Sequence, residues 1–432
     1  MKNLIILIAI LLCFNNSYAQ NKTTVKEPPV PCNGDADNLP GKYTDHTNPK
    51  YPSSLKGTAP DKALMLRQLI AIEKLEEASR NNFQLNGCVA RVSFSGGDKT
   101  AYGNFVQASY GYQLAAYQNV CHVTEHIVKT VGEYRTVLRV DVNPSLGRGY
   151  MIPAGTGEFY LDKGRSIHYD IPIDAKQGPN YGTESRTHPS RISQYISEAM
   201  VLTSRSDDYK NKHADFLKLV NGEGYVENWM GGSRYDKPRP NGYNWIDRHY
   251  MIVKPGIPIL MPVSRKQYLE DLLEYFEIEK ANFYYDLENK VKTNASNDSE
   301  NGKKRAAALE ADRNAYPQLY EAKKAKVKEL LATQKAEWLQ KPAIVGTNSN
   351  AYDAKQRLAD LGRFDDVENE KAGIVYAYNP AYFKSNANQP LKPLLIEVQF
   401  RYELSKDRGF SERLFNNFLK NYDLNALQKM LE

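Results

Sequence analysis

Apolar positions recur with helical spacing in one early segment and with a period of two residues in the long stretch that follows. Thr58 and Pro60 favour the start of a helix, and the helical spacing continues to a stop near Gly87. From Cys88 to about Asp174, Gly-rich turns separate short runs with the period of half-buried strands. The pattern predicts an antiparallel sheet or sandwich-like region, with strands at 89–94, 105–112, 134–142, 158–161 and 167–171.

The segment between residues 190 and 262 predicts two helices followed by two strands. Ser190 can cap the first helix, and Ser206 can start a second one that ends at Gly222. After a turn-rich stretch, the strand pattern returns at 249–253 and 257–261. These helices are expected to flank the sheet.

Two long amphipathic segments follow Ser264, which is placed to cap the first of them. A polar linker from Asn294 to Gly302 separates the segments, so they predict a long antiparallel helical hairpin that is kinked or interrupted at Pro317. The apolar faces expected to pack are Leu269, Leu272, Leu273, Phe276, Phe283, Leu287 and Val291 in the first segment, and Leu309, Tyr316, Leu319, Tyr320, Val327, Leu330, Leu331 and Trp338 in the second.

The chain after Pro342 predicts one more helix, strands at 373–378 and 394–402, and a closing pair of short helices. The whole chain is therefore assigned to the α+β class. The expected segments are a signal peptide (1–19), an extended Pro/Asn-rich leader (20–60), an α+β main domain (61–262), the helical hairpin (263–341) and a C-terminal α/β segment that packs on the main domain (342–432).

The first residues have the features of a cleavable signal peptide. Lys2 precedes an apolar run from Leu4 to Leu12, and Ser17-Tyr18-Ala19 places small residues where a signal peptidase reads. The run is too short to span a bilayer, which needs roughly 20 apolar residues. We expect an exported, periplasmic or extracellular protein without a membrane span. Lipidation of Cys13 is the alternative, although Leu12 stands where a small residue is expected.

Composition and charge indicate a folded globular protein without a nucleic-acid partner. The chain is 41% hydrophobic and 25% charged, which does not fit a disordered class. Its formal net charge of +6 is spread along the sequence, whereas nucleic-acid binding needs a clustered basic face. The chain is tyrosine-rich, with 30 tyrosines, which we expect to pack in strands and interfaces; ligand stacking is the alternative.

Three cysteines remain after removal of the signal peptide, so they cannot all pair within one molecule. Cys88 and Cys121 lie in strand-like, apolar stretches, whereas Cys32 lies in the leader. In an oxidising compartment the Cys88–Cys121 pair is the expected disulfide. Buried free thiols are the alternative that the sequence leaves open.

The stretch from His122 to His126 spells H-x-x-E-H, the zinc motif of inverted zincins. On a helix, His122 and His126 would share one face and could bind zinc, with Glu198 as a third ligand at a compatible distance. The flanking residues are mostly β-branched and favour a strand. We therefore predict a strand and no metal, and keep the zinc site of His122, His126 and Glu198 as the alternative.

The turn-rich stretch from Trp229 to His249 is the candidate binding site. Aromatic faces beside hydrogen-bonding groups suit a sugar or a peptide, although the stretch fits a long surface loop that buries its aromatics in its own small core better. The candidate binding residues are Trp229, Arg234, Tyr235, Tyr243 and Trp245.

Motifs for serine and cofactor chemistry are incomplete or missing. The segment Gly231-Gly232-Ser233-Arg234-Tyr235 lacks the final glycine of a G-x-S-x-G elbow. The sequence contains neither G-x-x-x-x-G-K-[ST] nor G-x-G-x-x-G, which bind phosphates and dinucleotides. We therefore expect no cofactor.

Two short stretches give the chain a family likeness. Leu39-Pro40-Gly41-Lys42-Tyr43-Thr44-Asp45-His46 and Asn379-Pro380-Ala381-Tyr382-Phe383, the latter followed by a strand, resemble segments of uncharacterised exported proteins of Gram-negative bacteria. Those proteins have no assigned activity. The resemblance therefore implies export and implies nothing about chemistry.

Together these patterns favour a non-catalytic binding or interaction role in the periplasm or outside the cell. The expected partner is an envelope protein or an extracellular ligand. The alternative is a secreted hydrolase that acts on an extracellular peptide or glycan, including an H-x-x-E-H zinc peptidase. Glycosidase carboxylate pairs have no readable sequence spacing, so the lack of a motif is weak evidence against an enzyme.

The mature chain is predicted to begin at Gln20, because Ala19 is the small residue best placed after the apolar run. Mass spectrometry of the exported protein should show an N-terminus at Gln20. An intact Met1, or a lipid on Cys13, would contradict this assignment.

Overall fold

The structure is a computed structural model. It describes residues 28–34, 36–47, 54–81, 83–102, 105–146, 158–162, 165–168, 195–197, 217–230, 244–346, 358–369, 372–384, 388–404 and 409–432. The signal peptide lies outside these residues. The helix expected from Ser190 is wrong where the structure describes it, because Ile196 and Ser197 form a short strand that pairs with Tyr376 and Val375. Of the helix expected from Ser206 to Gly222, the described residues 217–220 are helical.

A seven-stranded sheet forms the largest unit and confirms the α+β class. Its strand order is β1-β2-β3-β4-β13-β9-β8, and every neighbouring pair is antiparallel except β1 and β2, which are parallel. The last long strand of the chain therefore lies inside the sheet, between β4 and β9. The strands are β1 (Lys42–His46), β2 (Cys88–Tyr102), β3 (Phe105–Cys121), β4 (Val128–Val142), β8 (Val226–Met230), β9 (Asn244–Val253) and β13 (Leu395–Leu404).

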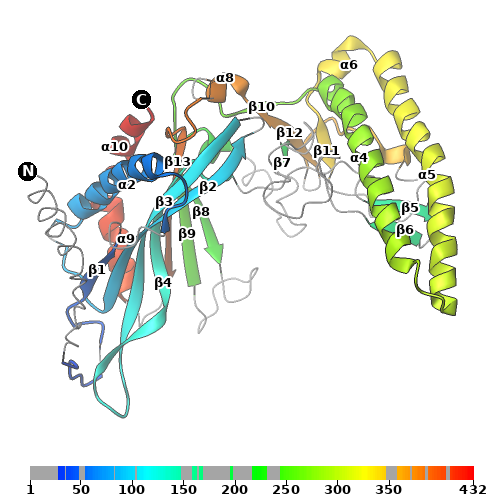
Figure 1. Cartoon of the computed structure of the whole chain (residues 1–432). Helices are drawn as coiled ribbons and strands as arrows, with labels where there is room; N and C mark the ends of the chain where they lie inside the picture. The colour runs from blue at the N-terminus through cyan, green and yellow to red at the C-terminus, as the bar shows by residue number, and fades with distance from the viewer. Residues whose placement is uncertain are drawn as a thin grey trace, which may run out of the picture.

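Three helices, α2 (Ala59–Ser79), α9 (Gly409–Asn421) and α10 (Leu424–Gln428), lie on one side of this sheet (Figure 1). The predicted start of α2 is confirmed, because Thr58 forms a capping box with Asp61. The helix ends at Ser79, earlier than predicted, because the residues before β2 pair with the leader: Gly41 donates its backbone N–H to the carbonyl of Leu85. Apolar side chains from α2, α9 and the strands fill the core between the two layers.

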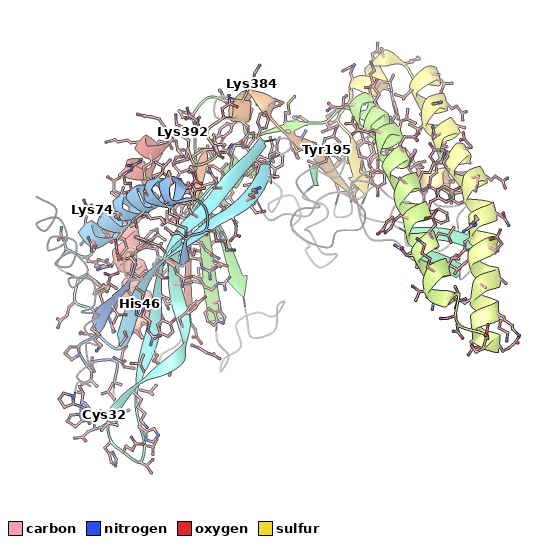
Figure 2. All side chains as sticks on the ribbon, viewed as in Figure 1. Cys32, His46, Lys74, Tyr195, Lys384 and Lys392 are labelled. Carbon is pink, nitrogen blue, oxygen red and sulfur yellow. A yellow bond between two sulfur atoms is a disulfide. The ribbon has the colours of Figure 1, made fainter. Side chains whose placement is uncertain are left out.

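The described part of the leader belongs to the sheet layer. It contributes β1 and is tied to the β3–β4 turn by a disulfide between Cys32 and Cys121, whose Cα atoms are 5.8 Å apart (Figure 2). The predicted Cys88–Cys121 pairing is wrong. Cys88 starts β2 and is fully buried as a free thiol in the core beneath α2, whereas Cys121 ends β3 next to the leader.

Two long helices, α4 (Arg265–Asn294) and α5 (Glu300–Thr333), lie side by side away from the sheet (Figure 1). The predicted cap is confirmed, since Ser264 accepts from the backbone N–H of Gln267 at 3.2 Å. The linker is shorter than predicted, because Ser299 caps α5 at Glu300. The predicted interruption at Pro317 is wrong: α5 runs through it. Most of the predicted apolar positions of both helices pack in one core.

Contacts between α4 and α5 appear in opposite order along the two helices, so the helices run antiparallel. Near one end Asn294 Nδ2 donates to the carbonyl of Gly302 at 2.9 Å, and further along the rings of Phe283 and Tyr316 stack with centroids 3.8 Å apart. Beyond these, Lys323 Nζ donates to Glu279 Oε1 at 2.8 Å in a fully buried ion pair.

Smaller elements connect the two regions. Strands β10, β12, β11 and β7 form a second sheet, and β5 pairs with β6. A third apolar core, containing Tyr102, Tyr378 and Phe383, joins this second sheet to the first. The remaining elements are β5 (Glu158–Asp162), β6 (Arg165–His168), β7 (Ile196–Ser197), β10 (Leu260–Pro262), α6 (Ala336–Gln340), β11 (Ile344–Gly346), β12 (Ala372–Tyr378) and α8 (Pro380–Phe383).

Replacing Lys323 by Met is expected to destabilise the protein by about 3–5 kcal/mol, because it leaves the buried Glu279 carboxylate without its cation. Urea unfolding followed by circular dichroism measures this loss. Lys328→Met, on the exposed side of the same helix, is the matched control and should change stability by less than about 0.5 kcal/mol. Equal stability of the two variants would contradict the assigned role of the ion pair.

Candidate functional site

The structure places only part of the binding site that the sequence predicts. Trp229 lies in β8 and Trp245 in β9, and the backbone register pairs Met230 with Trp245. Arg234, Tyr235 and Tyr243 lie outside the described residues. The predicted grouping of these aromatic residues therefore stays a prediction. Of the five candidate side chains, the structure describes only that of Trp245, which is half-buried on β9.

The H-x-x-E-H segment is a turn, so the predicted strand is wrong at the motif itself. The chain reverses between β3 and β4: the backbone N–H of His122 donates to the carbonyl of Ile127, and His126 has a φ of 50°. The β-branched residues on both sides do lie in strands. Glu198 lies outside the described residues, and no group of His, Cys, Asp and Glu among the described residues could hold a metal ion.

Strand β13 presents alternate side chains to the two sides of the sheet. Ile396, Val398 and Phe400 enter the core beneath the helices, so the residues between them face the opposite side. The backbone register places polar residues of β4 and β9 directly beside them. We call this the polar face of the sheet, and it consists of Gln113, Arg139, Asp141, Asp247, His249, Glu397, Gln399 and Arg401.

His249 lies between two carboxylates at the centre of the polar face. Its Nδ1 is 2.7 Å from Glu397 Oε1, and its Nε2 is 3.2 Å from Asp247 Oδ1. Burial alone would lower the pKa of His249, but the hydrogen bonds and charges of Asp247 and Glu397 raise this pKa to about 9. The imidazole is therefore a fixed cation at neutral pH.

Asp247 is buried, and its carboxylate accepts hydrogen bonds from side chains on two strands. Besides His249, Gln399 Nε2 donates to Asp247 Oδ1 at 2.8 Å and Arg401 Nη2 donates to Asp247 Oδ2 at 2.9 Å. Burial would raise the pKa of Asp247, but hydrogen bonds from His249 and Arg401 lower it to about 2. This carboxylate is ionised throughout the physiological range.

Asp141 occupies the adjacent position on β4, directly opposite Glu397. Burial and the negative charge of Glu397 raise the pKa of Asp141 to about 6, against the lowering effect of Arg139. Gly111 lies beside it on β3, where a Cβ atom would collide with the Asp141 carboxylate. Glycine at position 111 thus leaves room for this side chain.

The polar face offers fixed donors, acceptors and charges on rigid strands, which can bind a polar ligand without rearrangement. Sequence reasoning included Asp247 and His249 in the turn-rich stretch but missed their partners on β13. The signal was the alternation of Glu397, Gln399 and Arg401 with apolar residues inside a strong strand pattern. That alternation does not show which strands lie next to β13, so it does not predict which side chains contact these three residues.

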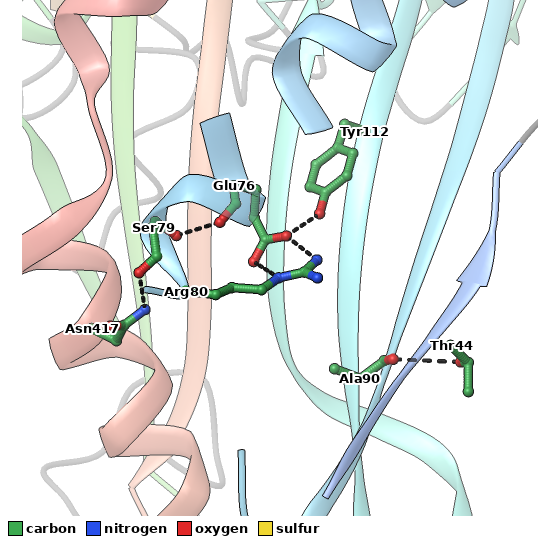
Figure 3. Close-up of polar contacts among 7 residues, drawn as sticks. All are labelled: Thr44, Glu76, Ser79, Arg80, Ala90, Tyr112 and Asn417. Atoms are coloured by element: carbon green, nitrogen blue, oxygen red, sulfur yellow. Dashed lines mark hydrogen bonds and ion pairs between the residues drawn. The ribbon is translucent and has the colours of Figure 1, made fainter. Parts of the chain in front are cut away.

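A second polar cluster lies inside the core and is structural (Figure 3). Glu76 of α2 is buried and accepts hydrogen bonds from Arg80 Nε at 2.9 Å and Tyr112 Oη at 2.7 Å. Asn417 of α9 donates to the carbonyl of Ser79 at 3.0 Å. These contacts join α2 to β3 and α9, so their role is to fix the helices on the sheet.

Comparison with models of known protein families, with curated proteins and with solved structures finds no match to this chain. The polar face therefore has to be interpreted from its own geometry.

The raised pKa of His249 predicts a pH dependence of stability. Its contribution is fully present below the ordinary histidine pKa of about 6.5 and is lost as the pH rises through about 9, with a total of up to about 3 kcal/mol. Chemical unfolding between pH 6 and 10 should show this decline in the wild type but not in His249→Gln. The control His122→Gln alters the exposed β3–β4 turn and should keep the wild-type profile. A decline that persists in His249→Gln would contradict the prediction.

Proposed function

We propose that the chain is an exported, non-catalytic binding protein whose polar face holds a polar extracellular ligand or an envelope partner. The observation that carries this proposal is the His249–Asp247–Glu397 network, which is extended by Gln399 and Arg401 across β9 and β13. Charged groups at the centre of a sheet cost desolvation energy, and apolar residues there would serve stability at least as well. Their presence favours a role beyond folding.

Two observations support export. The first nineteen residues have the pattern of a signal peptide, as argued above. Cys32 and Cys121 form a disulfide, and disulfides persist mainly in oxidising compartments. Among the described helices, none has the length and apolar character needed to cross a bilayer.

Binding is favoured over catalysis by the protonation states at the centre of the face. A general acid or base works best with a pKa near the operating pH. The pKa values of Asp247 and His249 lie at about 2 and about 9, so both groups keep fixed charges near neutrality. Fixed charges orient a ligand and exchange few protons with it.

A hydrolase is the second candidate, and the Asp141–Glu397 pair is the observation that favours it. The pKa of Asp141 is raised to about 6 beside the carboxylate of Glu397. Two carboxyl groups with different environments are typical of acid/base pairs, including those of glycosidases. A hydrolase would consume the ligand that it binds at this face.

The two candidates are separated by a ligand screen with the purified mature protein. Thermal shift against a panel of bacterial envelope glycans, extracellular polysaccharides and peptides identifies ligands, and mass spectrometry of each ligand after prolonged incubation detects turnover. We expect a ligand that stabilises the wild type and is recovered intact. Recovery of cleaved products would support the hydrolase instead.

Arg401→Gln tests whether the polar face is the site. Asp247 keeps its hydrogen bonds to His249 and Gln399 in this variant, so the fold is expected to survive while affinity falls at least tenfold. The control Arg363→Gln removes an exposed arginine from another region and should bind like the wild type. Unchanged affinity in Arg401→Gln, or retention of the protein in the cytosol, would contradict the proposal.

A further inference from the structure

Asp141 and Glu397 are acidic residues placed directly opposite each other on neighbouring strands. The register pairs them between β4 and β13, and opposite residues in a sheet have Cβ atoms roughly 4.5–5.5 Å apart. Like charges in this position destabilise a sheet. When two carboxyl groups share a site, the pKa of one of them is raised, so the pair tends to hold one proton.

Among the residues that the structure describes, no cationic group contacts Asp141 directly. On β4, Arg139 directs its guanidinium away, with Nε donating to Gln113 Oε1 at 3.1 Å and Nη2 donating to Tyr134 Oη at 3.0 Å. On β3, the opposite residue is Gly111, which has no side chain. The charge of Arg139 therefore acts on Asp141 only through space.

On the other side, Glu397 Oε1 is 2.7 Å from Nδ1 of the protonated imidazole of His249 on β9. The neighbour of Glu397 on β9 in the register is Met251, which carries no charge. Within the described part of the chain, a cation thus contacts Glu397 and none contacts Asp141. A proton that binds the pair will reside mainly on Asp141.

We propose that Asp141 and Glu397 form a proton-binding site that changes the charge of the polar face between mildly acidic and neutral pH. In the acidic form Asp141 carries the proton and can donate it as a hydrogen bond toward Glu397. In the neutral form the proton has passed to solvent, and Asp141 is ionised. The site depends on the fold alone, so it stands whether or not the binding function proposed above is correct.

The expected pH dependence of stability follows from the raised pKa of Asp141, which lies at about 6. In the unfolded chain an aspartate has a pKa of about 3.9, so between these two values the folded state binds more protons than the unfolded state. The contribution of Asp141 to stability therefore falls as the pH rises from about 4 to about 6 and is constant above that, where the separate decline caused by His249 begins. His249 stays protonated across this range, since its pKa is raised to about 9.

Urea unfolding of the full mature chain at pH 4 to 7.5 tests the proposal with Asp141→Asn, which mimics the protonated state at every pH. The unfolding constant of the wild type should increase relative to that of Asp141→Asn by roughly 10- to 100-fold between pH 4 and 7. Asp298→Asn, in the exposed linker between α4 and α5, is the control and should keep the wild-type profile. Parallel profiles of the wild type and Asp141→Asn would overturn the proposal.

Carboxyl ¹³C NMR keeps the proposal testable if Asp141→Asn does not fold. In the wild type labelled at aspartate, one side-chain carboxyl signal should titrate near pH 6, and in Glu397→Gln the same signal should titrate at lower pH because the neighbouring charge is gone. No aspartate titrating above pH 5, or an unchanged midpoint in Glu397→Gln, would show that the pair does not act as a proton-binding site.

Discussion

Strand β13 is the element on which both sides of the main sheet depend. It pairs with β4 through residues 396–401 and with β9 through residues 395–404, and without it these two strands would have no common neighbour. The same ten residues serve two purposes. Val398 and Phe400 anchor the helices in the core, while Glu397 and Arg401 complete the polar face. Packing and candidate chemistry are thus fixed by one register, since a shift of one residue would exchange the two sides.

The polar face is stable because its charges neutralise one another in place. Asp247 accepts contacts from three side chains, His249, Gln399 and Arg401. These contacts offset the cost of burying its carboxylate. Asp141 has no such contacts among the described residues, and burial and the charge of Glu397 raise its pKa, which favours the protonated form. The face therefore combines a rigid, permanently charged centre with one neighbouring group that responds to pH. Asp247 and Asp141 lie on the same face of the sheet, so the difference between their pKa values arises from their different hydrogen-bond partners.

The sequence predicted those features of the fold that depend on residues close together in the chain. The capping residues Thr58 and Ser264 and the strand periods of β4, β12 and β13 were readable, because caps and alternation depend on neighbours in sequence. The pairing of Cys32 with Cys121 was not, since it depends on where the leader crosses the sheet. Nor was the turn at His122–His126, where chain reversal overrides the strand propensity of the flanking residues. The site was missed for the same reason, as its partners come from distant strands that only the strand order brings together.

The position of β13 also sets the order in which the molecule can be assembled. Strands β4 and β9 are synthesised long before their shared neighbour, so each has an open edge while the intervening chain, with both long helices, is being made. Open edges invite pairing with other chains, and contacts between distant segments form slowly. The nascent sheet thus consists of two halves that cannot join until the final tenth of the chain has emerged.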